Sequence, residues 1–288
     1  MSNLIEKYKK TIVSSIVVIP LLFNVNTMYA SDSDSTLSDI INNGKQVHSL
    51  VESNENHVSS NVVYDDEAKK IFEFLEMENN KAQQKNQLDD MNNIFQSPIM
   101  KNNESDDDYS IDWYRIQFQA VALGFNGIAA DKAAYFLRNS LQDDPEDKTY
   151  ADDSKWSNHF ETQTSLYTTL AMEWAEKIDE ANEEGKFHVS GRGTEATQVS
   201  NVGHDWYLSL GKISYIWSAS KDSDTGKWTV YNVINDVYDF DHIDEDDIPD
   251  DYPNDLVAIV ANHAADAQDA GAIVPYNISI YMKNTYTP

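Results

Sequence analysis

The feature that most constrains the fold is a change in hydrophobic period near Phe187. Before this residue, large apolar side chains recur at the spacing of helices, and after it they alternate with polar ones, as in strands that bury one face. A chain that makes this change builds helices first and a sheet afterwards. We therefore predict an α+β fold, with a helical N-terminal half packed on a small antiparallel sheet built round a long hairpin.

Three helices are predicted before the change in period, over 111–125, 129–141 and 154–182. Each carries several aromatic and aliphatic side chains, and the first is apolar over much of its circumference. Gly185 ends the third helix, because glycine readily takes the left-handed conformation found after helix C-termini. These helices supply the apolar faces that the sheet needs for a core.

The second half of the chain reads as a hairpin followed by a helix and a last strand. Apolar residues alternate over 206–217, the acidic segment 222–227 contains the Asp and Gly typical of a turn, and a return strand follows over 228–237. A fourth helix is expected over 254–271, and alternation resumes over 276–282. Gly191-Arg192-Gly193 is interpreted as a flexible turn.

The composition divides the chain into three parts. Residues 1–30 have the pattern of a secretion signal, 31–110 form an acidic, largely disordered leader, and 111–288 form the α+β domain. The leader contains one amphipathic helix over 65–95, which either docks elsewhere or frays, because nothing next to it in the sequence covers its apolar face. A linker composition follows over 96–110.

The secretion signal is predicted from its order of charge and hydropathy. Lysines within 7–10 precede a thirteen-residue apolar run over 11–23, which is too short to span a bilayer comfortably, and Ala30 suits the position before a cleavage point. Met28 is larger than the residue usual two positions earlier, so retention as an anchor stays open. We expect a secreted or cell-surface protein without a transmembrane domain once the signal is removed.

The charge and the absence of cysteine exclude several classes of function. The formal net charge is −28 and there is no cysteine. Such a charge repels nucleic acid and anionic membrane surfaces, and it favours divalent cations and basic proteins as partners. Without cysteine the chain has no disulfide, no thiolate zinc site and no cysteine nucleophile.

The candidate site lies where the return strand enters an acidic loop. Alternation puts Asp236 and Tyr238 on one face, with Asp239 at the strand exit. Close carboxylates either bind a divalent cation, Ca²⁺ or Mg²⁺, with Asp241 as a further ligand, or divide the roles of acid and base because like charges push their pKa values apart. Tyr238 would orient them. The alternative is a strand end of solvated aspartates.

The Asp-x-Tyr-Asp arrangement of Asp236, Tyr238 and Asp239 resembles the core of the catalytic motif of the colicin M family. The hairpin before it is similar to those in C-terminal domains of exported or polymorphic bacterial toxins, and the likeness covers at most 203–282. It implies a mixed α/β fold, a divalent-metal requirement and hydrolysis of the lipid-linked peptidoglycan precursor lipid II.

The chain departs from this family after the second aspartate. The family's motif continues with a His-Arg pair about six residues further on, where this sequence has Glu245 and Asp246. His242 is nearby but out of register, and Arg192 is the candidate to replace the missing arginine. An arginine matters here because a pyrophosphate needs cationic stabilisation.

Two classes of function therefore remain after the sequence has been read, and whether the chain is an enzyme stays open. The first is an exported toxin-like hydrolase that acts on a phosphorylated, lipid II-type envelope intermediate. The alternative is a non-catalytic acidic secreted protein that binds calcium or a protein partner, as an immunity protein, an inhibitor or an adhesion module. In an adhesion module, some of the six tryptophans would form a sugar-stacking surface instead of core.

Overall fold

The computed structural model describes residues 62–89, 106–127, 129–197, 199–242 and 254–288. The predicted secretion signal, the start of the leader and the acidic loop from Ile243 to Pro253 lie outside these residues. No helix in the described ranges has both the length and the apolar character that a bilayer crossing needs.

A six-stranded sheet forms the centre of the fold, in the order β1-β3-β4-β5-β6-β2. The four middle strands are antiparallel, and β2 joins the edge parallel to β6. The strands are β1 (Val63–Tyr64), β2 (Lys148–Tyr150), β3 (His188–Ala196), β4 (Lys212–Lys221), β5 (Trp228–Tyr238) and β6 (Tyr276–Tyr286). The hairpin β4–β5 lies at the middle, so the predicted α+β class and the hairpin-centred antiparallel sheet are confirmed.

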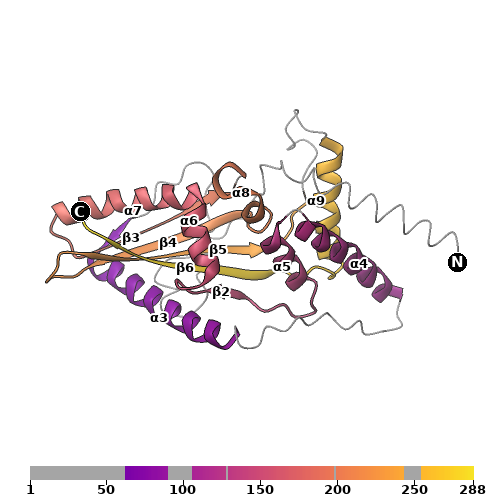
Figure 1. Ribbon diagram of the computed structural model, residues 1–288, viewed down its shortest axis with the longest axis horizontal. Helices are drawn as coiled ribbons and strands as arrows, with labels where there is room; N and C mark the ends of the chain where they lie inside the picture. The colour runs from indigo at the N-terminus through magenta and orange to yellow at the C-terminus, as the bar shows by residue number, and fades with distance from the viewer. Residues whose placement is uncertain (1–61, 90–105, 128, 198, 243–253) are drawn as a thin grey trace.

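Helices cover both faces of this sheet (Figure 1). Helices α6 and α7 lie on one side and α3 lies on the other. The helices are α3 (Asp65–Asp89), α4 (Asp106–Gly127), α5 (Asp131–Ser140), α6 (Lys155–Gln163), α7 (Ser165–Glu183), α8 (Val199–Tyr207) and α9 (Asn254–Asp269). The large core, rich in tryptophan and phenylalanine, lies between the sheet and the helices from α4 onward.

Two helix predictions need correction, and both corrections come from local hydrogen bonding. The single helix predicted over 154–182 is divided at Thr164, which has extended backbone and caps α7 by accepting a hydrogen bond from the Tyr167 amide. The segment around Trp206 was predicted as a strand, but it forms α8 and a following turn. Trp206 and Leu210 are both buried and four residues apart, and the Leu210 amide donates to the Trp206 carbonyl at 2.8 Å.

The Gly191-Arg192-Gly193 prediction was wrong, because these residues lie inside β3. The two glycines leave room for aromatic rings on the neighbouring strand. A Cβ atom on Gly191 would lie 2.6 Å from the Trp217 ring, and one on Gly193 would clash with the Tyr215 ring. The glycines therefore serve close packing across β3 and β4. The short strands β1 and β2 were also missed, because two or three residues carry no periodic pattern.

Helix α3 docks on the second face of the sheet, which resolves the choice that the sequence left open. Its Ile71 and Leu75 join Ile216, Tyr231 and Val233 in a separate apolar cluster on that face. The structure thus includes part of the predicted leader in the compact body. Helix α4 likewise begins inside the predicted linker, at Asp106.

Truncation of the α3 apolar face should destabilise the whole domain. Leu75 is 1% exposed, whereas Met77 on the same helix is 44% exposed. We expect Leu75→Ala to lower the free energy of unfolding by about 2–4 kcal/mol, and Met77→Ala to change it by less than about 0.5 kcal/mol. Urea unfolding of both variants measures this. Equal, small effects would mean that α3 does not contribute to the cooperative core.

The role of the β3 glycines is also testable. Gly191→Ala should cost about 1–3 kcal/mol, because the Trp217 ring must move from its packed position. Gly127, at the end of α4, has no atom within 4 Å of its would-be Cβ, so Gly127→Ala is the matched control and should be close to neutral. Thermal unfolding followed by tryptophan fluorescence reports both stability and the Trp217 environment. An unchanged Gly191→Ala variant would contradict the packing account.

Candidate functional site

Asp236 is a buried carboxyl near the end of β5. It is 7% exposed, and it lies in register with Ile278 of β6 on the face that holds the large core. Its Oδ2 accepts a hydrogen bond from the Gly211 amide at 3.0 Å. Burial raises the pKa of Asp236 well above its ordinary range, and the nearby charge of Asp239 adds to this. The environment therefore favours the neutral acid.

Asp239 stands just beyond the strand, where the chain begins to meet solvent. Partial burial and then the charge of Asp241 raise the pKa of Asp239 to about 6. The charge of Asp239 is a minor cause of the raised pKa of Asp236, whereas the charge that acts on Asp239 is that of Asp241. The two carboxyls singled out by the sequence are therefore neighbours along the chain that make no direct contact with each other among the described interactions. One is enclosed and the other is more accessible, and this difference gives them unlike proton affinities.

Tyr238 lies on the same face as Asp236, as alternation predicted, and it belongs to an aromatic wall. Its ring centroid is 6.0 Å from Phe136, 5.5 Å from Tyr276 and 5.4 Å from Phe240. Burial and then the charge of Asp236 raise the pKa of Tyr238, so the phenol stays protonated. These rings pack Tyr238 into the large core, on the face of the sheet that also holds Asp236.

The last turn of α9 holds the segment that carries Asp239. The Gln268 side chain accepts from the Phe240 amide at 2.9 Å and donates to the Phe240 carbonyl at 3.2 Å. His242 Nε2 lies 3.0 Å from Asp269 Oδ2, and this bond raises the pKa of the exposed imidazole. His242 is therefore engaged with α9. Asp239 is fixed from both sides, by the strand before it and by Gln268 after it.

The proposed metal ligands do not form a complete site by themselves. Within the ranges that the structure describes, no three His, Asp or Glu side chains lie close enough together to hold a metal ion. Asp241 is exposed beside the pair. A cation bound by Asp236 and Asp239 would thus need further oxygen ligands from water or substrate.

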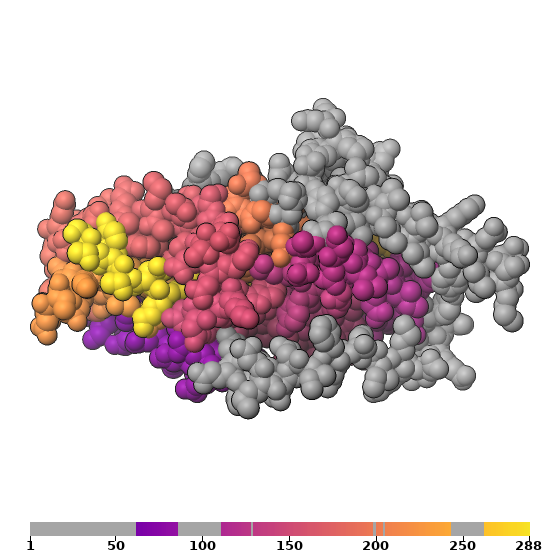
Figure 2. Space-filling view, viewed as in Figure 1, coloured from indigo at the N-terminus to yellow at the C-terminus, as the bar shows by residue number. Residues whose placement is uncertain are grey.

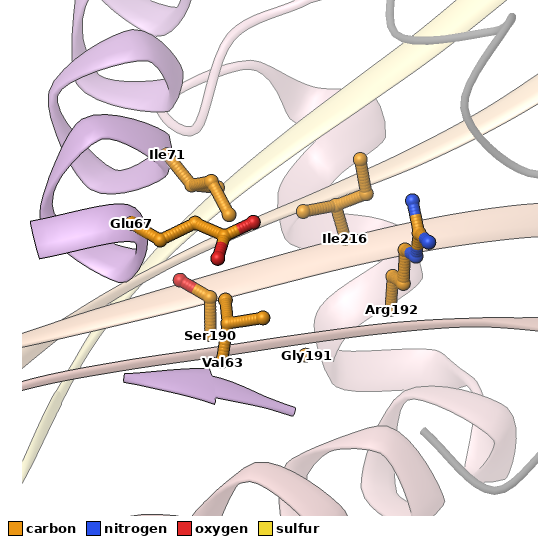
Figure 3. A pocket seen from close by; sticks show the side chains of 7 residues that line it. All are labelled: Val63, Glu67, Ile71, Ser190, Gly191, Arg192 and Ile216. Carbon is orange, nitrogen blue, oxygen red and sulfur yellow. The ribbon is translucent and has the colours of Figure 1, made fainter. Parts of the chain in front are cut away.

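Arg192 cannot replace the missing arginine, because it lies on the other face of the sheet. It pairs in register with Ile216, which faces α3, whereas Asp236 faces the large core. Its side chain lines a cavity of about 50 Å³ beside Glu67 and Ile71 (Figure 3). The alternation of a strand therefore separates this arginine from the carboxyl pair.

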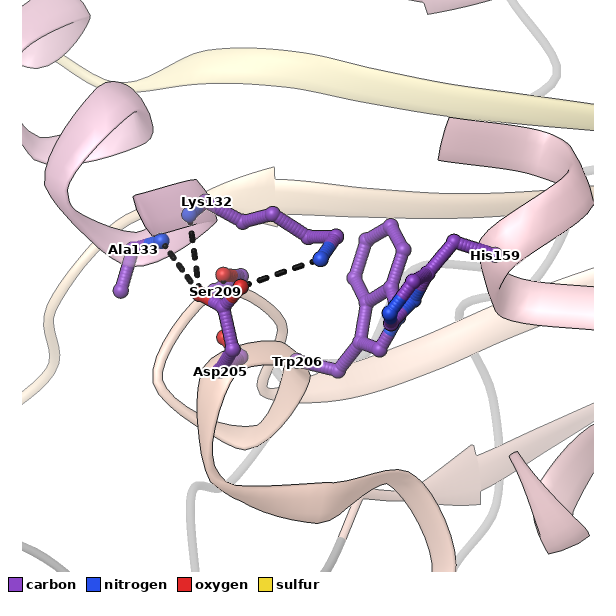
Figure 4. A network of polar contacts seen from close by, with 6 residues as sticks. All are labelled: Lys132, Ala133, His159, Asp205, Trp206 and Ser209. Carbon is purple, nitrogen blue, oxygen red and sulfur yellow. Dashed lines mark hydrogen bonds and ion pairs between the residues drawn. The ribbon is translucent and has the colours of Figure 1, made fainter. Parts of the chain in front are cut away.

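A second polar cluster joins α5 to α8 and was not anticipated from the sequence (Figure 4). Asp205 accepts from the amides of Lys132 and Ala133 at 2.9 and 3.1 Å, and its other oxygen pairs with the Lys132 ammonium at 3.0 Å. It caps α5, whose own N-cap residue, Ala130, makes no side-chain cap. No local signal could reveal this, since the partners are 73 residues apart.

His159 completes this cluster on its outer side. Trp206 donates its indole N–H to His159 Nδ1 at 2.9 Å, so the neutral ring carries its proton on Nε2. Burial and then the charge of Lys132 lower the pKa of His159. The cluster is a structural support, because its charged groups are already paired with each other.

No known family model matches the chain, and comparisons with curated proteins and with solved structures gave no match. The function must therefore be argued from the geometry of its own residues. Of the two polar clusters, the carboxyl pair at the end of β5 is the candidate active site. It combines perturbed proton affinities, a rigid support and access to solvent.

The His159 bond predicts a measurable dependence on pH. Because burial and the charge of Lys132 lower the folded-state pKa of His159, protonation favours the unfolded chain. The stability linked to this ring is present above pH 6.5 and lost as pH falls below it. Titration of the His159 ring by NMR should give a pKa below 6.5. In Trp206→Phe, which removes the N–H donor, it should move back toward 6.5. The His242 titration in both proteins is the control, and equal values for His159 would contradict the assignment.

Proposed function

We propose that this protein is an exported, toxin-like hydrolase in which Asp236 and Asp239 act as acid and base on a phosphorylated, lipid II-type cell-envelope intermediate. The observation that carries the proposal is the unlike burial of the two carboxyls, with Asp236 enclosed and Asp239 near solvent at a rigid strand end. The likeness of Asp236, Tyr238 and Asp239 to the colicin M motif supports the choice of substrate class.

The two carboxyls have the proton affinities that hydrolysis needs. With a pKa of about 6, Asp239 is mostly ionised at neutral pH and takes a proton from the attacking water. The water oxygen bonds to phosphorus while the bond to the leaving oxygen breaks, and Asp236 gives its proton to that leaving oxygen. The Gly211 amide then stabilises the carboxylate left on Asp236. Proton exchange with solvent restores both groups.

The hydrogen bonds around Asp236 and Asp239 serve this chemistry because they limit the motion of the two carboxyls. Asp236 is inside the β5–β6 ladder, and Asp239 lies between the last paired residue, Tyr238, and the Gln268 clamp on Phe240. Groups held in this way need little reorganisation when a proton moves. If Asp239 held a Ca²⁺ or Mg²⁺ ion, the ion would supply the positive charge that Glu245 and Asp246 do not.

The proposal is tested by neutralising each carboxyl with little change in volume. We expect Asp236→Asn and Asp239→Asn each to lower the rate of lipid II cleavage, measured by separating the lipid product from the sugar product, by at least about 100-fold. Asp224→Asn, at the exposed opposite end of the same hairpin, makes the same change in charge and should leave the rate unchanged. Assays with Ca²⁺, with Mg²⁺ and with chelator decide whether a cation is required.

Stability gives an independent measure on the same variants. The folded-state pKa of Asp239 is raised, so the wild-type fold loses stability as pH rises from about 4 through about 6. Asp239→Asn should remove this loss and stabilise the protein by about 1–2 kcal/mol at pH 7, with little effect at pH 4. Melting curves at both pH values measure this.

The alternative is a non-catalytic secreted protein that captures calcium or a basic partner through its charge of −28. It predicts no turnover of lipid II under any ionic condition. It also predicts that Asp236→Asn and Asp239→Asn give the same background signal as Asp224→Asn in the lipid II assay. That pair of results would overturn the hydrolase proposal.

A further inference from the structure

We infer that the outer face of α4 binds the same face of a second copy of this chain, so that two α4 helices pack antiparallel about a two-fold axis. The contact is made by Trp113, Ile116, Ala120 and Leu123, which we name the α4 stripe. The inference goes beyond the proposed function, because it does not depend on the chemistry of the carboxyl pair.

The α4 stripe lies on the side of the helix that faces away from the core. Its residues follow one another at spacings of three, four and three, which keeps them on one face of a helix. Ile116 is 36% exposed and Leu123 is 66% exposed, while Trp113 and Ala120 are half-buried. The opposite side of α4 packs into the large core through Phe118, Ala122 and Phe125. Helix α4 lies at the surface on the face seen in Figure 2, so Ile116 and Leu123 present apolar area to solvent.

The other large apolar side chains that are exposed among the described residues are scattered. Each lies on a different segment of the chain, and they are Met77, Tyr135, Met172 and Phe187. Single exposed side chains of this kind are common on protein surfaces and need no partner. Two on one face of the same helix favour an interaction surface.

The charge around the α4 stripe favours a second copy as the partner. The chain has 49 acidic residues, but between Trp113 and Ala130 it has no Asp or Glu, and Arg115 is the one charged residue there. Arg115 is engaged within the chain, since it pairs with Asp143 at 2.7 Å and donates to the Ala272 carbonyl at 3.4 Å. A basic partner would find no carboxylate in this segment, whereas two acidic molecules can meet along it without close like charges.

The α4 stripe is complementary to itself when the two helices run antiparallel. With the two-fold axis at the level of Phe118, Ile116 faces the partner's Ala120 and Trp113 faces the partner's Leu123. A large side chain then meets a small one beside the axis, and the same contacts occur twice. Antiparallel packing also brings the positive end of each helix dipole to the negative end of the other.

The size of the contact sets the expected strength of the dimer. Residues 113–123 of a helix span about 15 Å, or three turns. A contact of this length buries less than the roughly 1,200 Å² that stable interfaces bury. We therefore expect a weak, reversible dimer with a Kd above about 1 μM.

Sedimentation equilibrium of the full chain over about 1–500 μM tests the inference. We expect a monomer–dimer equilibrium whose Kd rises at least tenfold in Leu123→Glu. Met172→Glu is the matched control, because Met172 is 69% exposed on α7 and gains the same charge, and its Kd should stay within about twofold of the wild type. Added salt should tighten the dimer, because it screens the repulsion between two chains of charge −28.

The absence of cysteine allows a direct test of the orientation. Leu123→Cys mixed with Trp113→Cys should form a disulfide between the two variants under mild oxidation, because these positions face each other. Ile116→Cys mixed with Ala120→Cys is a second such pair, and it leaves Trp113 in place. Leu123→Cys alone should form little disulfide, since its two copies lie about 15 Å apart along the helix axes.

Several results would overturn the inference. One is a chain that stays monomeric over the whole concentration range, and another is a dimer that Leu123→Glu and Met172→Glu weaken equally. Ready disulfide formation by Leu123→Cys with itself would contradict the antiparallel arrangement. A monomer that binds phosphatidylcholine vesicles, and loses this binding in Leu123→Glu, would assign the α4 stripe to a lipid surface instead of a second copy.

Discussion

The structure depends on burying both faces of one antiparallel sheet. Strand β5 crosses the middle of that sheet, and nine of its eleven residues are buried. One face packs Trp217 and Trp228 under the helical layer, and the other packs Tyr231 and Val233 under α3. Both helical layers are needed for stability, because each face of this sheet is apolar and would be exposed to water without its layer.

This burial also produces the chemistry of the candidate site. A carboxyl on a strand buried for almost its whole length must give up water, and backbone groups of Gly211 and Val237 compensate only part of this loss for Asp236. Its charged form is therefore costly, which is why its pKa rises. Three residues later the strand has ended, and Asp239 regains part of its hydration. The different proton affinities of two chemically identical side chains follow from where the strand stops.

The same strand geometry decides which charged groups can act together. Alternation carries Arg192 to the α3 face and Asp236 to the opposite one, although both belong to the same sheet. Pairing across β5, β6 and β2 does the reverse, since it brings Asp236 and Lys148 to one face from positions far apart in the chain. Lys148, on an edge strand, thus shares the face of Asp236, whereas Arg192 does not.

Local periodicity was sufficient to predict the α+β class, the hairpin β4–β5 and the strand-end position of Asp236, Tyr238 and Asp239. These features depend on contacts between residues close in sequence, so the pattern of apolar side chains carries them. The pattern misread the segment around Trp206. Apolar residues at 206, 208 and 210 alternate as in a strand, but 206 and 210 are also four apart, as on one face of a helix. The pattern also misread Gly191 and Gly193. These positions must lack a side chain because aromatic rings from β4 occupy the space, and the local sequence does not show those rings.

The sequence by itself determined the charge, the absence of thiol chemistry and the order of the longer helices and strands, since composition and period are properties of the chain alone. Only the tertiary structure decided that α3 belongs to the core, that Arg192 is separated from the carboxyl pair, and that Asp205 caps α5. It also decided that Asp236, rather than Asp239, is the more deeply buried carboxyl. Each of these outcomes depends on partners tens of residues away, and their proximity is set by the register of strands and the packing of helices, which no local pattern encodes.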